Sequence, residues 1–250
     1  MAAVWRTPAF IRDCIAFARM NRSPGEWPFG RFYPYLGDRR AAAGTAKGHY
    51  FHQDLLVARR IYECNPVRHV DVGSRVDGFV AHVASFRKIE VADIRPLKAS
   101  IANVAFTQID LMAPLAAQHL AMCDSLSCLH ALEHFGLGRY GDRLDPDGHL
   151  TGLANLARML GEDGILYLSV PIGPQRIDFN SERVFGMAHM LDLLDRAGFD
   201  LLRFSCVDDD GDLIENQTLS PVLVETNCGV EYGCGIFELT KRRQPGSAAS

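Results

Sequence analysis

The sequence has little that suits a membrane or a nucleic acid as partner. It contains no run of about 20 apolar residues, the length that crosses a bilayer, so we expect no membrane span. Its formal net charge is −4, whereas general nucleic-acid binding needs a basic surface. Arg6 and Arg12 are not accompanied by the continuous apolar segment of a signal peptide. These absences predict a cytoplasmic protein with no nucleic-acid partner.

Zinc-ribbon spacing is also missing from the cysteines. There are seven of them, an odd number, scattered along the chain. Cys123, Cys128 and Cys206 stand in apolar, strand-like runs and are interpreted most simply as reduced core residues. This usage favours a reducing compartment. The 250 residues are 48% hydrophobic and 22% charged, which fits one globular domain with an N-terminal extension.

The order of segments predicts the architecture. Residues 1–48 combine a short helix over 9–20 with an irregular arm rich in Pro, Gly, Arg and aromatic residues. Residues 49–240 begin with a helix over 49–63 and then alternate strands with helices, and residues 241–250 form a small polar tail that we expect to fray. Such alternation predicts an α/β fold, a doubly wound and mostly parallel sheet with helices on both faces. The expected strands are 70–72, 89–92, 104–109, 121–128, 165–170, 201–207 and 234–239.

The segment 69–95 has the pattern of a nucleoside-binding unit. A strand ends at the Gly73 turn, an apolar stripe with helical spacing follows over 79–86, and a second strand ends at Asp93. Asp93 lies 22 residues after Asp71. An acid about 20 residues beyond such a turn commonly accepts the ribose hydroxyls.

The glycines of this turn discriminate between cofactors. A dinucleotide fingerprint has glycines at 73, 75 and 78, but residue 75 is Arg. A side chain there hinders the approach of a pyrophosphate. S-adenosylmethionine (SAM) has no phosphate, so SAM is favoured over NAD. A glycine turn without a ligand is the alternative.

Longer motifs resemble those of class I SAM-dependent methyltransferases over roughly residues 49–240. The sequences that carry the resemblance are Val-Asp-Val-Gly-Ser (70–74), Val-Ala-Asp (91–93), Thr-Gln-Ile-Asp (107–110), Leu-His-Ala-Leu-Glu-His (129–134) and Gly-Ile-Leu-Tyr-Leu-Ser-Val-Pro (164–171). Further motifs are similar to a bacterial branch that often occurs with surface-polysaccharide genes. The resemblance implies seven strands with the last antiparallel, and SAM over the strand carboxyl ends.

The resemblance also implies the residues that contact the cofactor. Gly73 and Ser74 follow Asp71 in the turn at the methionine end, and Arg75 either pairs with the methionine carboxylate or is a surface arginine. The remaining implied contacts are Asp93 and Ile94 at the ribose and adenine, Asp110 and Leu111 at the adenine rim, and Cys128 and Leu129 under the sulfonium.

His130 to His134, after the fourth strand, has three interpretations. If the segment is helical, His130, Glu133 and His134 share a face. One histidine, His134 first and His130 second, would act as general base on a hydroxyl. Alternatively the three residues bind Mg²⁺ or Mn²⁺, or the segment only begins and caps a helix. His-x-x-Glu-His is also a zinc-peptidase motif, but its place in a nucleoside-binding unit disfavours that reading.

Two loops are candidates for acceptor binding. Arg139, Tyr140 and Asp142 lie in a glycine-rich loop beside the histidines, and Arg176 follows the fifth strand. These side chains would grip a sugar or its phosphate, although an ordinary connecting loop has the same composition. The sequence thus predicts a SAM-dependent methyltransferase that O-methylates a saccharide hydroxyl or a similar small acceptor. A non-catalytic partner subunit and an NAD-linked enzyme are the alternatives.

Overall fold

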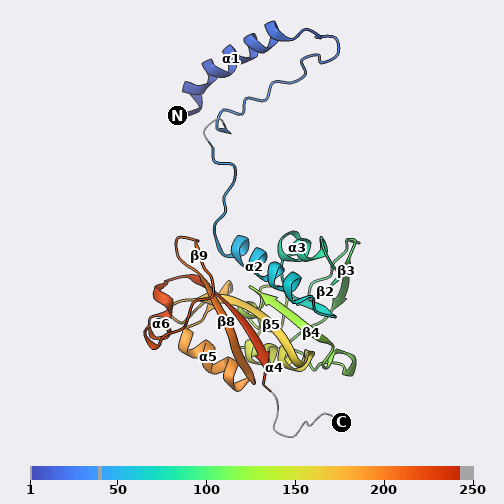
Figure 1. Ribbon diagram of the computed structural model, residues 1–250, viewed down its shortest axis with the longest axis vertical. Helices are drawn as coiled ribbons and strands as arrows, with labels where there is room; N and C mark the ends of the chain where they lie inside the picture. Colours follow the sequence, from blue (N-terminus) through green and yellow to red (C-terminus); the bar gives the residue numbers. More distant parts are fainter. Residues whose placement is uncertain (1, 39–40, 243–250) are drawn as a thin grey trace. The chain divides into compact units, whose positions relative to one another are not determined.

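The computed structural model describes residues 2–38 and 41–242, which excludes most of the predicted tail (Figure 1). The chain divides into two compact units, Met1–Ala46 and Lys47–Ser250. Helix α1 (Ala2–Met20) contains the helix predicted over 9–20 and precedes an irregular segment. Within the described ranges, no helix combines the length and the apolar character needed to cross a membrane.

The second unit is built on one sheet of eight strands, in the order β3-β2-β1-β4-β5-β10-β8-β9. Strands β1 to β5 are parallel, and β10 runs antiparallel to both β5 and β8. All seven expected strands are present, and the two-residue edge strand β9 is an addition. The bounds are β1 His69–Val72, β2 Ile89–Asp93, β3 Val104–Gln108, β4 Cys123–Leu129, β5 Leu160–Ile172, β8 Phe199–Val207, β9 Leu213–Ile214 and β10 Gly233–Lys241.

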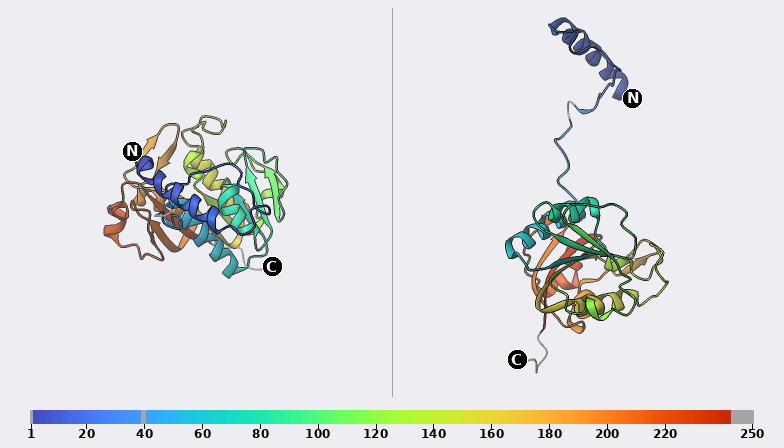
Figure 2. Two further views of the ribbon diagram at one scale, coloured as in Figure 1. Left: turned by 90° about the horizontal axis from the view of Figure 1, so that it is seen from above. Right: turned by 90° about the vertical axis from the view of Figure 1, so that its right-hand side faces the viewer.

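Helices cover both faces of this sheet, as the alternating pattern predicts (Figures 1 and 2). On one face, α2 (His49–Cys64) and α3 (Ala81–Ala84) bury side chains such as Ile61 and Val83 in one apolar cluster. On the other, α4 (Gly148–Met159) and α5 (Met187–Arg196) contribute Leu156, Met190 and others to a larger cluster. Burial of these apolar stripes fixes the sheet between two helical layers.

Several short elements depart from the expected pattern. The range 79–86 predicted as helix contains the end of a π-helical turn, Val76–Val80, and the short α3, and Gly78 just before it adopts non-helical backbone angles. A small hairpin of β6 (Arg176–Asp178) and β7 (Glu182–Val184) follows β5, and α6 (Pro221–Glu225) precedes β10. Single 3₁₀ turns occur at Ala117–His119, Leu132–His134 and Asn227–Gly229.

The order of strands determines where a ligand site forms. Chain order proceeds outward from β1 to β2 and β3 on one side, and from β4 to β5 on the other. In a doubly wound sheet, the loops diverge at such a reversal and leave a crevice outside the carboxyl ends of the strands. The segments after β1, β2 and β4 therefore meet at one edge.

Candidate active site

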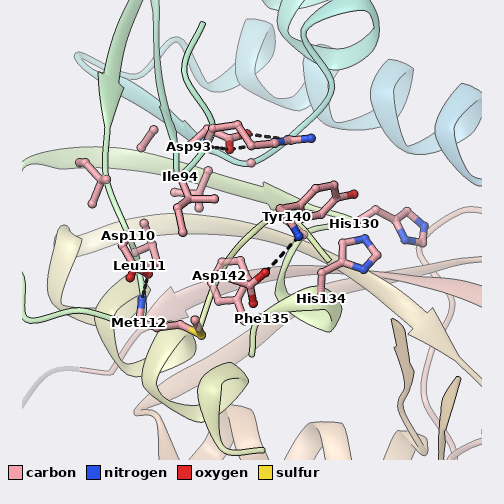
Figure 3. A pocket seen from close by; sticks show the side chains of 16 residues that line it. Asp93, Ile94, Asp110, Leu111, Met112, His130, His134, Phe135, Tyr140 and Asp142 are labelled. Carbon is pink, nitrogen blue, oxygen red and sulfur yellow. Dashed lines mark hydrogen bonds and ion pairs between the residues drawn. The ribbon is translucent and has the colours of Figure 1, made fainter. Parts of the chain in front are cut away.

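A cavity lies at that edge, between the carboxyl ends of β1, β2 and β4 (Figure 3). Its cavity volume is about 50 Å³, and its open mouth brings the total space to about 530 Å³. The residues from the sequence prediction that line it are Gly73, Asp93, Ile94, Asp110, Leu111, His130, His134, Tyr140 and Asp142.

Asp93 ends β2 and is held by Arg95, a residue that the sequence reasoning missed. Arg95 donates from Nε to Oδ1 at 3.0 Å and from Nη2 to Oδ2 at 2.6 Å. Its guanidinium also lies 4.3 Å from the ring centroid of Tyr140. The carboxylate of Asp93 is therefore aligned at the cavity wall, and a ribose that binds it must share or displace Arg95.

Gly73 makes the turn after β1, and its neighbours Asp71 and Ser74 lie beneath it. Gly73 has φ 74°, and a Cβ there would lie 2.9 Å from Cβ of Ala131. Asp71 is fully buried and accepts hydrogen bonds from the Ser74 hydroxyl at 2.6 Å and the Ser127 hydroxyl at 2.5 Å. Burial raises the pKa of Asp71 to about 7, against these hydrogen bonds. Asp71 and Ser74 thus shape the turn rather than line the cavity.

The apolar part of the cavity lining suits a flat, weakly polar group. Ile94, Leu111 and Met112 line it, and Asp110 turns the chain there by accepting from the Met112 amide at 2.8 Å. A carboxylate for ribose hydroxyls, an apolar slot for a base and a turn that only glycine fits are the features that an adenosyl cofactor needs. The residues present therefore fit SAM.

The segment after β4 does not form the helix considered from the sequence. His130 has φ 48°, and only Leu132–His134 makes a 3₁₀ turn. Instead, the two imidazoles meet at the fully buried Glu133: Oε1 is 2.7 Å from Nδ1 of His130 and 3.7 Å from Nε2 of His134. In Figure 3, both imidazoles lie at one end of the cavity, away from Asp110 and Met112.

His134 has its tautomer set by a backbone carbonyl. Its Nδ1 lies 2.7 Å from the oxygen of Ser181, closer than the 3.3 Å to Nη1 of Arg139, and since a carbonyl only accepts, Nδ1 carries the hydrogen. Its Nε2 then keeps a lone pair that is able to take a proton.

The loop residues predicted for the acceptor separate into different roles. Asp142 accepts from the backbone N–H groups of Gly136, Gly138 and Tyr140 and so organises the loop. Tyr140 faces the cavity, and Arg139 donates to the Ser181 carbonyl at 3.1 Å.

The other predicted side chains lie elsewhere. Arg176 pairs with Asp178 and lines a second cavity beside β6 and α5. Arg75 pairs with Asp77 at the exposed surface, 5.2 Å from the ring centroid of Tyr50. Cys128 and Leu129 are buried in the two apolar clusters.

The residues expected to bind a metal do not form one set. Among the described residues, two groups of donor atoms lie within 4.8 Å of one another: His49, His130 and Cys234, and Glu133, His134 and Glu182. Burial and the neighbouring His130 lower the pKa of His49 to about 4. His130 therefore belongs to one group and Glu133 and His134 to the other. The sequence did not predict Cys234 or Glu182 as possible ligands.

Comparisons with known proteins agree with this architecture. The model of the family described as "Caenorhabditis protein of unknown function, DUF268" matches residues 81–221. No curated protein matches the sequence.

Three solved structures are similar in fold. The [4+2]-cyclase SpnF has a TM-score of 0.55 at 15% identity, with 77% of this chain and 82% of that chain covered. The Burkholderia thailandensis 1,6-didemethyltoxoflavin-N1-methyltransferase, bound to S-adenosylhomocysteine, has a TM-score of 0.54 at 15% identity, with 76% of this chain and 79% of that chain covered. A SAM-dependent methyltransferase from Clostridium acetobutylicum has a TM-score of 0.50 at 10% identity, with 78% of this chain and 92% of that chain covered. The fold is that of class I methyltransferases. Because one neighbour is described as a cyclase, the fold alone does not define a reaction.

Proposed function

This chain belongs to the family described as "Caenorhabditis protein of unknown function, DUF268", and we propose that it is a SAM-dependent methyltransferase acting on a hydroxyl group. One observation carries the proposal: a single cavity joins an adenosyl-type site at Asp93 to a buried pair of histidines around Glu133. A nucleoside site alone would need no such pair at the end where a methyl group would emerge.

The chain's residues divide the work of binding. Asp93 accepts the ribose hydroxyls, Ile94, Leu111 and Met112 enclose the adenine, and the Gly73 turn lets the backbone approach the methionine end. Bound SAM would supply a methyl group on a sulfonium, which departs as the neutral sulfur of S-adenosylhomocysteine. The protein's contribution is to align an acceptor oxygen with that methyl group.

Proton removal falls to His134. Its Nδ1–H is held by the Ser181 carbonyl, so Nε2 takes the hydroxyl proton as the oxygen attacks. The Glu133 carboxylate, 3.7 Å from Nε2, stabilises the resulting imidazolium.

The acceptor we propose is a saccharide or a similar small polyhydroxyl molecule. Its support is the polar rim: Tyr232 donates to Glu182 at 3.0 Å, and Glu182 has a donor atom within 4.8 Å of those of Glu133 and His134. Carboxylates and phenols beside the base suit a ligand with many hydroxyls. Arg176 adjoins this rim, since its guanidinium lies 6.0 Å from the ring centroid of Tyr232.

Two measurements test the proposal. Calorimetric titration with SAM, S-adenosylhomocysteine and NAD should detect the first two ligands and no binding of NAD. Incubation with methyl-labelled SAM and a panel of sugars and sugar phosphates should then transfer label to a hydroxyl. Failure to bind SAM at millimolar concentration would favour the non-catalytic partner, and binding of NAD alone would favour a dehydrogenase.

A further inference from the structure

Three donor side chains from distant parts of the sequence converge beside the cavity. His49 is the first residue of α2, His130 follows β4, and Cys234 is the second residue of β10. One ring nitrogen of each histidine and the Cys234 sulfur lie within 4.8 Å of one another. Strand β10 starts opposite the end of β5, so its antiparallel direction brings Cys234 to the edge where β4 ends.

His130 is oriented as a metal-binding histidine would be. Its Nδ1 is engaged by Glu133 Oε1 at 2.7 Å, while its Nε2 is buried and has no hydrogen-bond partner among the described residues. The whole residue is only 8% exposed, so water does not readily satisfy that nitrogen. A carboxylate on one imidazole nitrogen and a metal on the other is the usual arrangement around metal-ligating histidines.

The other two donors are also positioned by packing. The His49 ring stacks between the rings of His130 and Tyr232. The ring centroids are 5.2 Å apart with an interplanar angle of 4° for His130, and 5.3 Å apart with an angle of 29° for Tyr232. Cys234 is fully buried and is a free thiol. Its contacts with the Gln53 side-chain oxygen and the Gly235 carbonyl are both 3.9 Å long and therefore weak.

We propose that His49, His130 and Cys234 bind one Zn²⁺ ion, with Glu133 holding His130 from behind. Two imidazoles and one thiolate are a soft donor set that suits Zn²⁺ and disfavours Mg²⁺ or Mn²⁺, which prefer oxygen ligands. Binding releases the thiol proton to solvent, because sulfur coordinates as the thiolate. Three protein ligands leave a fourth position for an exogenous group, as in catalytic zinc sites.

Closing this site requires the His49 ring to turn, because it lies parallel to the His130 ring and an imidazole binds a metal in its own plane. Tetrahedral zinc with ordinary bond lengths sets its donor atoms roughly 3.3–3.8 Å apart, and these donors lie within 4.8 Å of one another. His49 is half-buried at the start of its helix, and its ring is the ligand that has to leave its stack with His130 and Tyr232. If the proposed function holds, an acceptor hydroxyl bound at the fourth position would lose its proton more readily on the metal.

The experiment measures metal binding without using activity. Tag-free protein, stripped with a chelator, is titrated with ZnCl₂ against a competing indicator, and one ion per chain is expected. Cys234→Ser and His49→Ala should each weaken binding by at least about 100-fold, since each removes a direct ligand. The matched controls are Cys123→Ser, at another buried cysteine, and His149→Ala, at a half-buried histidine at the start of α4; both should bind as the wild type does.

Cobalt gives an independent signature. Co²⁺ in this site should show thiolate-to-metal charge transfer in the near ultraviolet, present in Cys123→Ser and absent in Cys234→Ser. The proposal is overturned if the wild type binds no stoichiometric zinc, if the band survives in Cys234→Ser, or if His49→Ala binds like its control. Circular dichroism identifies a variant that fails to fold. If Cys234→Ser does not fold, the zinc affinity of His49→Ala tests the proposal, because His49 is only half-buried. SAM titration of the metal-free protein tests the proposed function separately.

Discussion

Glu133 Oε1 lies 2.7 Å from Nδ1 of His130 in the turn after β4, and the same oxygen is 3.7 Å from Nε2 of His134. One buried carboxylate thus serves two imidazoles. Glu133→Gln keeps the shape and removes the charge, so we expect weaker stabilisation of protonated His134 and weaker orientation of His130. Zinc affinity should fall by about 10–100-fold, as for other groups behind a ligand, while SAM affinity stays unchanged. Equal zinc affinity in the variant would show that Glu133 does not support the metal.

His134→Ala removes the proposed base. We expect the methyl-transfer rate to fall by about 10²–10⁴-fold, the usual contribution of a positioned base, with SAM affinity retained. The rate is measured in single turnover with labelled SAM, and His149→Ala is the control. Transfer at the wild-type rate would exclude His134 as base and leave the zinc-bound acceptor as the remaining route to deprotonation.

Asp93→Ala tests the ribose contact. Loss of charge-assisted hydrogen bonds should weaken SAM binding by about 1–3 kcal/mol, measured by calorimetry. Glu90→Ala is a control on the same strand, because Glu90 pairs with Arg68 at the exposed surface. If both variants bind SAM equally, the cofactor does not contact the end of β2.

The sheet is predictable from this sequence because its strands are short apolar runs between glycine turns. Val70, Val72 and the run 165–170 are short and flanked by turn residues, which favours strands, and their alternation with helices predicts a parallel sheet. The position of Asp93 follows from the same pattern, since strand ends meet at one edge.

The polar side of the site could not be predicted in the same way. Cys234 sits in an apolar strand and reads as a core residue, and only the antiparallel direction of β10 brings it beside His130. The positive φ of His130 breaks the helical spacing on which the shared face depended. Arg95 and Glu182 have no motif around them, and their roles depend on contacts with Asp93 and with the β6–β7 hairpin.

Two glycines of the loop after β4 offer a matched comparison of backbone and packing effects. Gly136 and Gly141 have nearly equal φ values, 80° and 81°. A Cβ at Gly136 would collide with the Asp145 backbone, whereas one at Gly141 meets nothing within 4 Å. Both alanine variants incur the left-handed penalty, so Gly136→Ala should lower the free energy of unfolding by about 1–3 kcal/mol more than Gly141→Ala. Chemical denaturation measures both free energies of unfolding. Equal losses in the two variants would mean that the loop moves to accommodate the added methyl group at residue 136 without a packing cost.

His69 makes the stability of the fold depend on pH. It is 2% exposed and lies 2.8 Å from the Ser125 hydroxyl, and burial lowers its pKa to about 3. The unfolded chain has an ordinary histidine with a pKa near 6.5. Below pH 6.5 the unfolded state therefore binds a proton that the native state does not, and stability is lost as the pH falls toward 3.

His69→Gln removes that proton uptake. Relative to the variant, the wild type should lose about 2 kcal/mol of unfolding free energy between pH 7 and pH 5. Asp71 changes the stability with pH in the opposite direction, because its folded pKa of about 7 exceeds the unfolded value. The unfolding free energy that it contributes at low pH is therefore lost as the pH rises from about 4 to 7. Urea denaturation of both proteins at each pH measures the contribution of His69 together with any change at Asp71, because the Ser127 hydroxyl contacts both side chains. His82→Gln at an exposed site is the control. If the difference in unfolding free energy between the wild type and His69→Gln were the same at pH 7 and pH 5, His69 would have the same pKa in the folded and unfolded chains.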